Sequence, residues 1–124
     1  MKKEEIVRLL MRCTQEFGLV YALGQVFGNN IHVNVGFTKL ACDASIDELL
    51  LSVRSSNALR RSNISTLGEL IAKLNEGDLK TIRNLGAKSI SEIKTKILVY
   101  GFDQLSDKDK TAFFYDLVEN NAVT

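Results

Sequence analysis

The chain has 124 residues, of which 45% are apolar and 25% are charged, and its formal net charge is +1. These values are typical of a small globular protein. No run of 18 apolar residues occurs, which argues against a membrane-spanning helix. Two distant cysteines and the absence of an N-terminal signal-peptide pattern predict a reduced, cytoplasmic protein.

The charge is distributed unevenly along the chain. Residues 1–53 carry a net charge of −1, residues 54–100 carry nine basic and four acidic side chains, and residues 101–124 carry two basic and five acidic ones. A basic middle of this kind suits a polyanionic partner. A lysine-rich, solvated helix surface is the alternative explanation of the same pattern.

The first third of the chain predicts one long helix followed by a short extended segment. Apolar residues recur with the 3.6-residue period over residues 3–27, and Gly28 and the two asparagines after it are expected to end the helix. Residues 31–37 alternate between apolar and polar side chains, which is the signature of a strand.

From Ser45 onward the pattern is helical. Ser45 and Glu48 have the spacing of a capping box. The helices expected after it are, in chain order, 53–62, from Ser65 or Thr66 to Lys73, 76–81, Lys88–Tyr100 with Gly101 past its end, and Ser106–Glu119.

We therefore predict an all-α protein with helical extensions at both ends of its middle part. The expected divisions are an N-terminal extension over 1–44, a central domain over 45–102 and an acidic C-terminal helix over 103–124. The apolar surface of the first segment exceeds a single stripe, so residues 1–37 are a candidate for contact with a partner or a second copy of the chain.

Two short blocks, 53–60 and 84–93, indicate a surface that can hold a nucleic-acid backbone. In the first, Arg54, Asn57 and Arg60 are spaced to share one helix face. In the second, a Leu85-Gly86 turn opens into a helix whose first turn carries a lysine and a serine. A helix N-terminus offers unpaired N–H groups and partial positive charge, both of which favour phosphate.

These blocks resemble the C-terminal domain of the bacterial RNA polymerase alpha subunit. The similarity runs from Ile46 to about Phe102, and its landmarks are Ile46-Asp47-Glu48-Leu49, Val53-Arg54-Ser55, Asn57, Leu59, Gly68-Glu69-Leu70, Leu79-Lys80-Thr81, Asn84-Leu85-Gly86, Lys88-Ser89 and Glu92-Ile93. The resemblance implies a compact helix-hairpin-helix-like (SAM-domain-like) bundle. It also implies that this bundle binds A·T-rich double-stranded DNA in the minor groove and contacts transcription factors or polymerase subunits.

The resemblance also implies a set of DNA-contacting positions. They fall on Arg54, Asn57, Ala58, Arg60, Gly86, Lys88, Ser89 and Glu92. Arg54 is expected to enter the groove, whose negative potential is enhanced in A·T tracts. Glu92 is acidic and is expected to orient Arg54 or an amide rather than to touch phosphate.

The sequence also departs from the family pattern. Ala58 stands where a cysteine is frequent, and Ile82-Arg83 stands where a single proline usually precedes Asn84. The polymerase-assembling N-terminal domain of the subunit has no counterpart in residues 1–44, which predicts a stand-alone relative.

Nothing in the sequence favours an enzyme. It holds no phosphate loop, no dinucleotide fingerprint and no nucleophile–base pattern, and we expect neither a cofactor nor a metal. The leading hypothesis is a transcription-associated, nucleoid-associated DNA-binding protein with no membrane role. The alternative is a protein-interaction module that docks a transcription factor or polymerase subunit without binding DNA.

Overall fold

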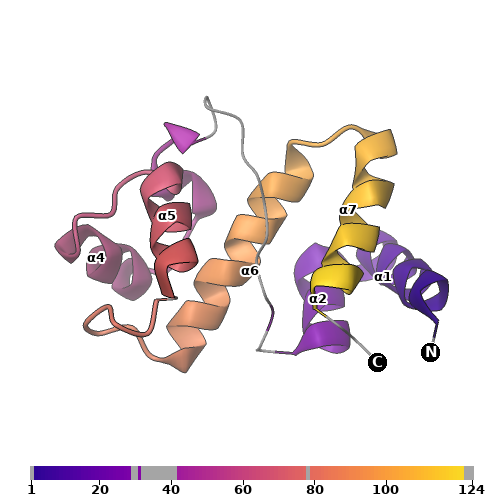
Figure 1. Cartoon of the computed structure of the whole chain (residues 1–124), viewed down its shortest axis with the longest axis horizontal. Coiled ribbons are helices and arrows are strands. Elements are labelled where there is room, and N and C mark those ends of the chain that lie inside the picture. Colours follow the sequence, from indigo (N-terminus) through magenta and orange to yellow (C-terminus); the bar gives the residue numbers. More distant parts are fainter. Residues whose placement is uncertain (1, 29–30, 32–41, 78, 122–124) are drawn as a thin grey trace. The chain divides into compact units, whose positions relative to one another are not determined.

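A computed structural model describes residues 2–28, 31, 42–77 and 79–121 (Figure 1). These residues form α-helices and one short 3-10 helix, and no strand is present among them. In chain order the elements are α1 (Lys3–Phe17), α2 (Leu19–Phe27), η1 (Ile46–Leu49), α4 (Val53–Arg61), α5 (Leu67–Gly77), α6 (Ala87–Asp103) and α7 (Asp107–Asn120). The predicted all-α class is confirmed for these residues.

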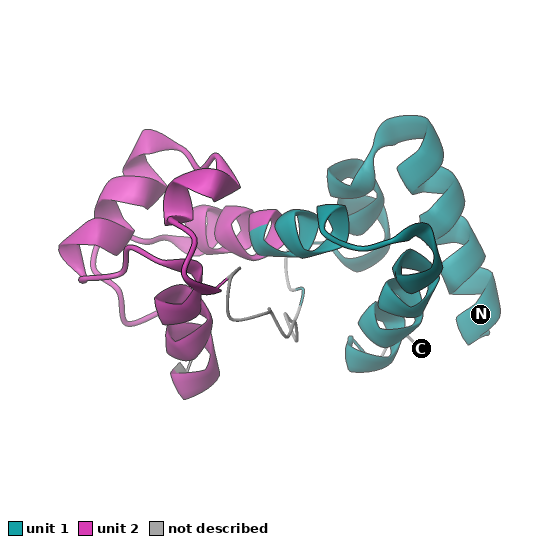
Figure 2. Cartoon of the chain, turned by 90° about the horizontal axis from the view of Figure 1, so that it is seen from above, with its two compact units in different colours: residues 1–35, 97–124 teal, residues 36–96 magenta. Residues whose placement is uncertain are grey.

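The protein divides into two compact units, coloured separately in Figure 2. Unit 1 comprises residues 1–35 and 97–124, and unit 2 comprises residues 36–96. The division falls within α6, so this helix contributes residues to both units.

Unit 1 has an apolar core built from segments near the two ends of the sequence. Its buried members come from α1, α2, the end of α6 and α7, and include Leu10, Leu23, Leu98 and Phe114. Three phenylalanine rings close the α6–α7 turn, with the centroid of Phe102 lying 5.4 Å from that of Phe113 and 5.3 Å from that of Phe114. The packing of these rings adds to the stability that burial alone gives the turn.

The predicted single helix over residues 3–27 is wrong, because the helix breaks at Gly18. Gly18 has φ 91° and ψ 162°, a conformation that residues other than glycine rarely adopt. Its N–H caps the end of α1 by bonding the Thr14 carbonyl. Both helices bury an apolar face in the same core, so the hydrophobic period continues across the break. Gly28 ends α2, with φ 68°.

Unit 2 buries a separate set of apolar residues from one continuous stretch of sequence. They are Ile46, Leu49, Ala58, Leu59, Ile64, Leu67, Leu70, Leu79, Ile82, Leu85 and Ile93. An isolated antiparallel bridge between Ser45 and Thr66 holds the segment before η1 next to the start of α5. The predicted helices at 53–62 and 106–119 are confirmed by α4 and α7 within one residue at each end.

The helix predicted over residues 76–81 is wrong. Helix α5 continues to Gly77, and residues 79–84 form turns in which the Ile82 N–H bonds the Leu79 carbonyl and the Leu85 N–H bonds the Ile82 carbonyl. Leu79, Ile82 and Leu85 are all buried, and their three-residue spacing fits such tight turns better than an α-helix.

Gly101 does not end α6, although the sequence predicted that it would. The helix continues to Asp103, and Gly101 is buried inside it. The strand predicted over residues 31–37 lies outside the described residues, apart from Ile31, which is buried in the core of unit 1.

Candidate nucleic-acid interface

Helix α4 begins at a serine cap that leaves its first turn exposed. The Ser52 hydroxyl accepts a hydrogen bond from the Ser55 N–H at 3.2 Å, which satisfies one of the free amides of the first turn. Arg54 and Asn57 are exposed on this helix. A guanidinium and an amide side chain are therefore available near the positive end of the α4 dipole.

Helix α6 begins at a glycine, which offers no capping side chain. The Gly86 carbonyl accepts the first helical hydrogen bond from the Ile90 N–H at 3.0 Å, which makes Gly86 the N-cap residue. Glycine has no polar side-chain atom with which to satisfy the amides of the first turn. Lys88 is exposed and Ser89 is half-buried at this helix start. The turn before it is tight, with Asn84 at φ 70°.

Among the described residues, no atom lies where a side chain at position 86 would begin. A Cβ built on this residue meets no atom within 4 Å, and its φ is not positive. An alanine would therefore fit the unbound protein. If a glycine is needed here, the need comes from a partner that approaches the backbone closely.

Glu92 ties the starts of α4 and α6 together. Its Oε1 accepts a hydrogen bond from the Ser55 hydroxyl at 2.7 Å, and its Oε2 accepts one from the Ser52 N–H at 3.3 Å. The Ser52 hydroxyl also lies 3.2 Å from Oε1. Ser55 is fully buried, so this carboxylate bond is a fixed internal contact. Glu92 thus bonds the amide of Ser52, one of the two roles expected for it.

The Glu92 contacts place the predicted surface residues at one end of unit 2. Ser55 follows Arg54 directly in α4, and Glu92 lies one helical turn after Lys88 and Ser89 in α6. The first turn of α4 therefore lies against the first turns of α6. Both helix starts expose a basic side chain, and neither Arg54 nor Gly86 is buried.

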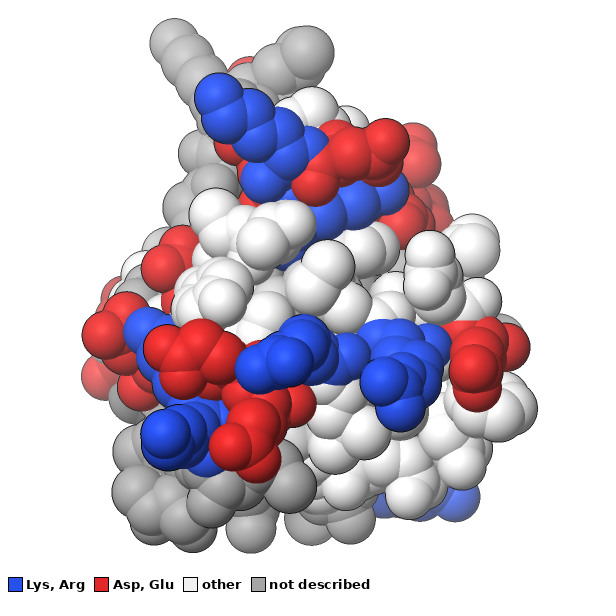
Figure 3. Space-filling view, turned by 90° about the vertical axis from the view of Figure 1, so that its right-hand side faces the viewer, with Lys and Arg blue, Asp and Glu red and all other residues white. Residues whose placement is uncertain are grey.

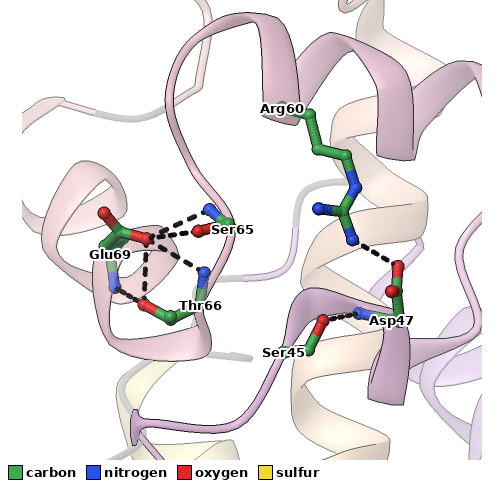
Figure 4. A network of polar contacts seen from close by, with 6 residues as sticks. All are labelled: Ser45, Asp47, Arg60, Ser65, Thr66 and Glu69. Atoms are coloured by element: carbon green, nitrogen blue, oxygen red, sulfur yellow. Dashed lines mark hydrogen bonds and ion pairs between the residues drawn. The ribbon is translucent and has the colours of Figure 1, made fainter.

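Arg60 is held by a carboxylate of the same unit (Figure 4). Its Nη2 lies 2.7 Å from Oδ1 of Asp47, in a pair whose side chains are 43% and 67% exposed. Asp47 is in turn positioned by η1, where its N–H bonds the Ser45 hydroxyl at 3.1 Å. Arg60 therefore differs from Arg54, because a neighbouring acid already neutralises its charge.

Ala58 is 1% exposed and belongs to the buried set of unit 2. Its methyl group packs inside the unit, so Ala58 cannot contact DNA directly and can affect binding only by positioning α4. Arg54, Asn57, Gly86 and Lys88 are exposed at the joined helix starts, and Ser89 and Glu92 are half-buried there.

A capping box at the start of α5 was missed, although its pattern is present in the sequence (Figure 4). Glu69 Oε1 accepts hydrogen bonds from the N–H groups of Ser65 and Thr66, and the Thr66 hydroxyl accepts one from the Glu69 N–H. Hydrogen bonds from the Ser65 amide, then from Thr66, lower the pKa of Glu69 below its ordinary value of 4.5. The predicted box at Ser45 is only half formed: Ser45 caps a 3-10 helix by accepting from Asp47.

Two exposed apolar residues beside Arg54 were also missed. Leu50 is 79% exposed and Val53 is 76% exposed. Leu50 takes the left-handed conformation, with φ 55° and ψ 47°, which is unusual for a leucine. An apolar run in a sequence indicates burial by default, so no sequence signal could have marked these two as surface residues.

Comparison with known proteins finds relatives of the segment that carries this site. Residues 38–98 match the family of the C-terminal domain of the bacterial RNA polymerase alpha subunit. This segment of the protein is a relative of that domain. It contains every residue of the joined helix starts, from Ser52 to Glu92.

Individual relatives agree with the family match. The protein is 45% identical over 101 residues to the DNA-directed RNA polymerase subunit alpha of Acidothermus cellulolyticus, an alignment that covers 79% of this chain and 28% of that protein. It is 54% identical over 55 residues to the subunit of the same name from Syntrophomonas wolfei, covering 44% of this chain and 17% of that protein. The matched part thus spans less than a third of the length of these relatives. No solved structure matches it significantly.

The described residues show neither a membrane-spanning helix nor a metal site. No helix among the described residues is long and apolar enough to cross a membrane. Within the same residues, no group of three or more histidine, cysteine, aspartate or glutamate side chains is arranged to hold a metal ion.

Proposed function

We propose that this protein acts in transcription by binding A·T-rich duplex DNA through the minor groove and the phosphate backbone. The observation that carries the proposal is the Glu92 contact, which holds two exposed basic helix starts at one end of unit 2. The relatedness of residues 38–98 to the C-terminal domain of the polymerase alpha subunit supports the same role.

Each residue has a role that follows from its chemistry. Arg54 enters the minor groove, where a narrow A·T tract concentrates negative potential. Lys88 and Ser89, together with the uncapped amides of α6, bind a phosphate. Gly86 allows the sugar–phosphate backbone to approach closely, and Asn57 bonds a sugar or a base edge.

The remaining predicted residues contribute indirectly. Glu92 positions the two helix starts and does not contact DNA. Arg60 adds positive potential, reduced by Asp47. Ala58 supports α4 from within the unit. Leu50 and Val53 offer apolar surface to the sugars that line the groove.

A gel-shift titration with A·T-rich and G·C-rich duplexes tests the proposal. Arg54→Ala should weaken binding to the A·T-rich duplex at least about tenfold, equivalent to about 1.4 kcal/mol. Arg61→Ala is the matched control, because it removes the same charge from the other end of α4. Equal affinity of Arg54→Ala and the unchanged protein at low salt would contradict the proposal.

Gly86→Ala sharpens the test, because the unbound protein has room for the added methyl group. Because alanine caps a helix start less well than glycine, we expect at most a small loss of thermal stability, together with a loss of DNA affinity of about tenfold or more. An alanine variant that binds as well as the unchanged protein would remove Gly86 from the interface.

A second function is favoured by the exposed Leu50 and Val53, whose apolar surface is typical of a protein contact. In this alternative the same end of unit 2 docks a transcription factor or polymerase subunit without DNA. Capture of a partner from cell extract with and without nuclease distinguishes the two, because only a protein-mediated contact survives nuclease.

We also propose a separate role for each of three segments of the sequence. Residues 45–102 form the DNA-binding domain, the acidic helix over 103–124 flanks it, and the extension over 1–44 serves a partner or a second copy, held through residues 1–37. A protein with this role acts at the nucleoid. Two copies would bring two DNA-binding domains to a fixed spacing on the duplex.

A further inference from the structure

Helix α1 and the residue before it present a stripe of exposed side chains with a regular order of charge. Lys2, Glu5, Leu9, Arg12 and Glu16 follow one another at spacings of three and four residues, so they lie within about 80° of one another around the helix axis. All five are exposed, and Leu9 at the centre is 40% exposed. We call these five residues the α1 stripe.

The charges of the α1 stripe have no ion-pair partners within the described residues. The ion pairs found there involve other side chains, such as Lys3 with Glu119 at 3.4 Å, and none includes Lys2, Glu5, Arg12 or Glu16. Glu5 and Arg12 are seven residues apart, roughly 10 Å along the helix axis, which is too far for a salt bridge within the helix. Figure 3 shows the side of unit 1 that carries α1 and α7, where a row of basic and acidic side chains crosses the surface.

The order of charges along the α1 stripe is complementary to itself when two copies of the helix run antiparallel. Read from its N-terminal end, the order is plus, minus, apolar, plus, minus, and read from the other end each charge has the opposite sign. In an antiparallel pair of α1 helices centred on Leu9, Lys2 of one copy faces Glu16 of the other, and Glu5 faces Arg12 within one residue. A two-fold axis through Leu9 repeats each contact twice, as a symmetric dimer requires.

We propose that the α1 stripe is the contact through which two copies of this protein associate, with their α1 helices antiparallel. The inference rests on the proposed role of residues 1–37 in holding a second copy, and it names the surface and the register. Leucine against leucine forms the centre of the contact, and ion pairs at its rim set the register and the orientation.

Further apolar surface lies at the end of α1. Phe17 is 62% exposed and Tyr21 is 46% exposed, with ring centroids 4.8 Å apart. Val20 beside them is 52% exposed. Phe17 follows Glu16 directly, so it lies at the C-terminal end of the α1 stripe, about 100° further around the helix axis. Exposed aromatic surface of this kind is enriched at protein interfaces.

Sedimentation velocity of the 124-residue chain, without DNA, over low to high micromolar concentration tests the proposal. The unchanged protein should sediment increasingly as a dimer. Arg12→Glu and Glu5→Arg each place like charges opposite one another and should weaken association about tenfold or more. The double variant restores opposite charges at both sites and should recover most of the association. Far-UV circular dichroism checks that each variant keeps its helices.

Arg8→Glu is the matched control, because Arg8 is exposed on α1 but lies outside the stripe. It should change association little. The proposed antiparallel register is wrong if neither single charge reversal weakens the dimer. It is also wrong if the double variant does not regain the association that the single variants lose. A monomer at every concentration overturns both the register and the proposed second copy, whereas the gel-shift test of DNA binding stands apart from either result.

Discussion

Unit 1 joins segments near the two ends of the sequence, with Leu10 and Phe114 in one apolar core, whereas the buried residues of unit 2 come from a continuous stretch. The helix starts differ as well. Neither α1 nor α2 is capped by a side chain, but α4 begins at Ser52 and α5 at the Thr66–Glu69 box. The N-terminal helices therefore depend on packing, whereas α4 and α5 of unit 2 add polar contacts that fix where they begin.

This difference explains where a recognition surface can lie. A helix start held by hydrogen bonds keeps its exposed side chains at defined positions, which a binding site requires. In unit 2 the carboxylate of Glu92 fixes two such starts at once. The N-terminal helices have an apolar and charged surface without such supports, which suits association with another helix.

The largest expected effect is on the stability of unit 1. Leu10→Ala removes a fully buried side chain and should cost about 2–5 kcal/mol of unfolding free energy. Met11→Ala, on the same helix but 39% exposed, should cost much less. Urea denaturation measures both, and equal losses would show that α1 does not depend on its buried face.

A smaller effect is expected from Glu92→Gln, and its sign is informative. If Glu92 affected DNA binding only through its negative charge, removing that charge would strengthen binding to the DNA. We expect instead that affinity for the A·T-rich duplex falls by about tenfold, because the helix starts lose a charge-assisted bond.

The salt dependence separates this role from direct contact. Loss of a phosphate contact, as in Lys88→Ala, should reduce the slope of log affinity against log salt by about 0.9, whereas Glu92→Gln should leave the slope unchanged. Glu76→Gln, an exposed acid on α5, is the control. Stronger binding by Glu92→Gln would contradict a positioning role.

The smallest effect concerns the cap of α5. Because hydrogen bonds lower the pKa of Glu69 in the folded protein, its stabilising contribution is complete above its ordinary value of 4.5 and is lost as the pH falls through the lower, folded value. Glu69→Gln should therefore be less stable than the unchanged protein at neutral pH, with a difference that shrinks in acid. Thermal melts from about pH 3 to about pH 7, which span the titration of carboxylates, measure it. If the difference in melting temperature between the two proteins stays constant across this pH range, ionised Glu69 does not stabilise the start of α5.

Local signals in the sequence predicted several elements well. The starts of α4 and α7 were predicted within one residue, and the structure shows that a serine, Ser52 or Ser106, caps each of them. The N-terminal break was not predictable, because Gly18 lies within an apolar period that both helices share. Gly101 looked like a helix end and is instead buried inside α6. In each case glycine permits several conformations, and packing decides among them.

The candidate site, too, could be predicted only in part from the sequence. The motif predicted that Arg54, Gly86 and Lys88 act together, but it did not reveal which acid would hold which partner. Arg60 is bound by Asp47, and Ser55 by Glu92, over separations of 13 and 37 residues. Contacts over such separations leave no trace in local spacing.

The sequence by itself determined that the protein is helical, that its middle is basic and that residues 53–93 carry the pattern of the C-terminal domain of the polymerase alpha subunit, because side-chain period, charge and short motifs are local properties. Only the tertiary structure decided that Glu92 joins two helix starts, that Asp47 neutralises Arg60 and that α1 leaves a charged stripe exposed. Those outcomes depend on which distant residues come within hydrogen-bonding distance when the two cores form.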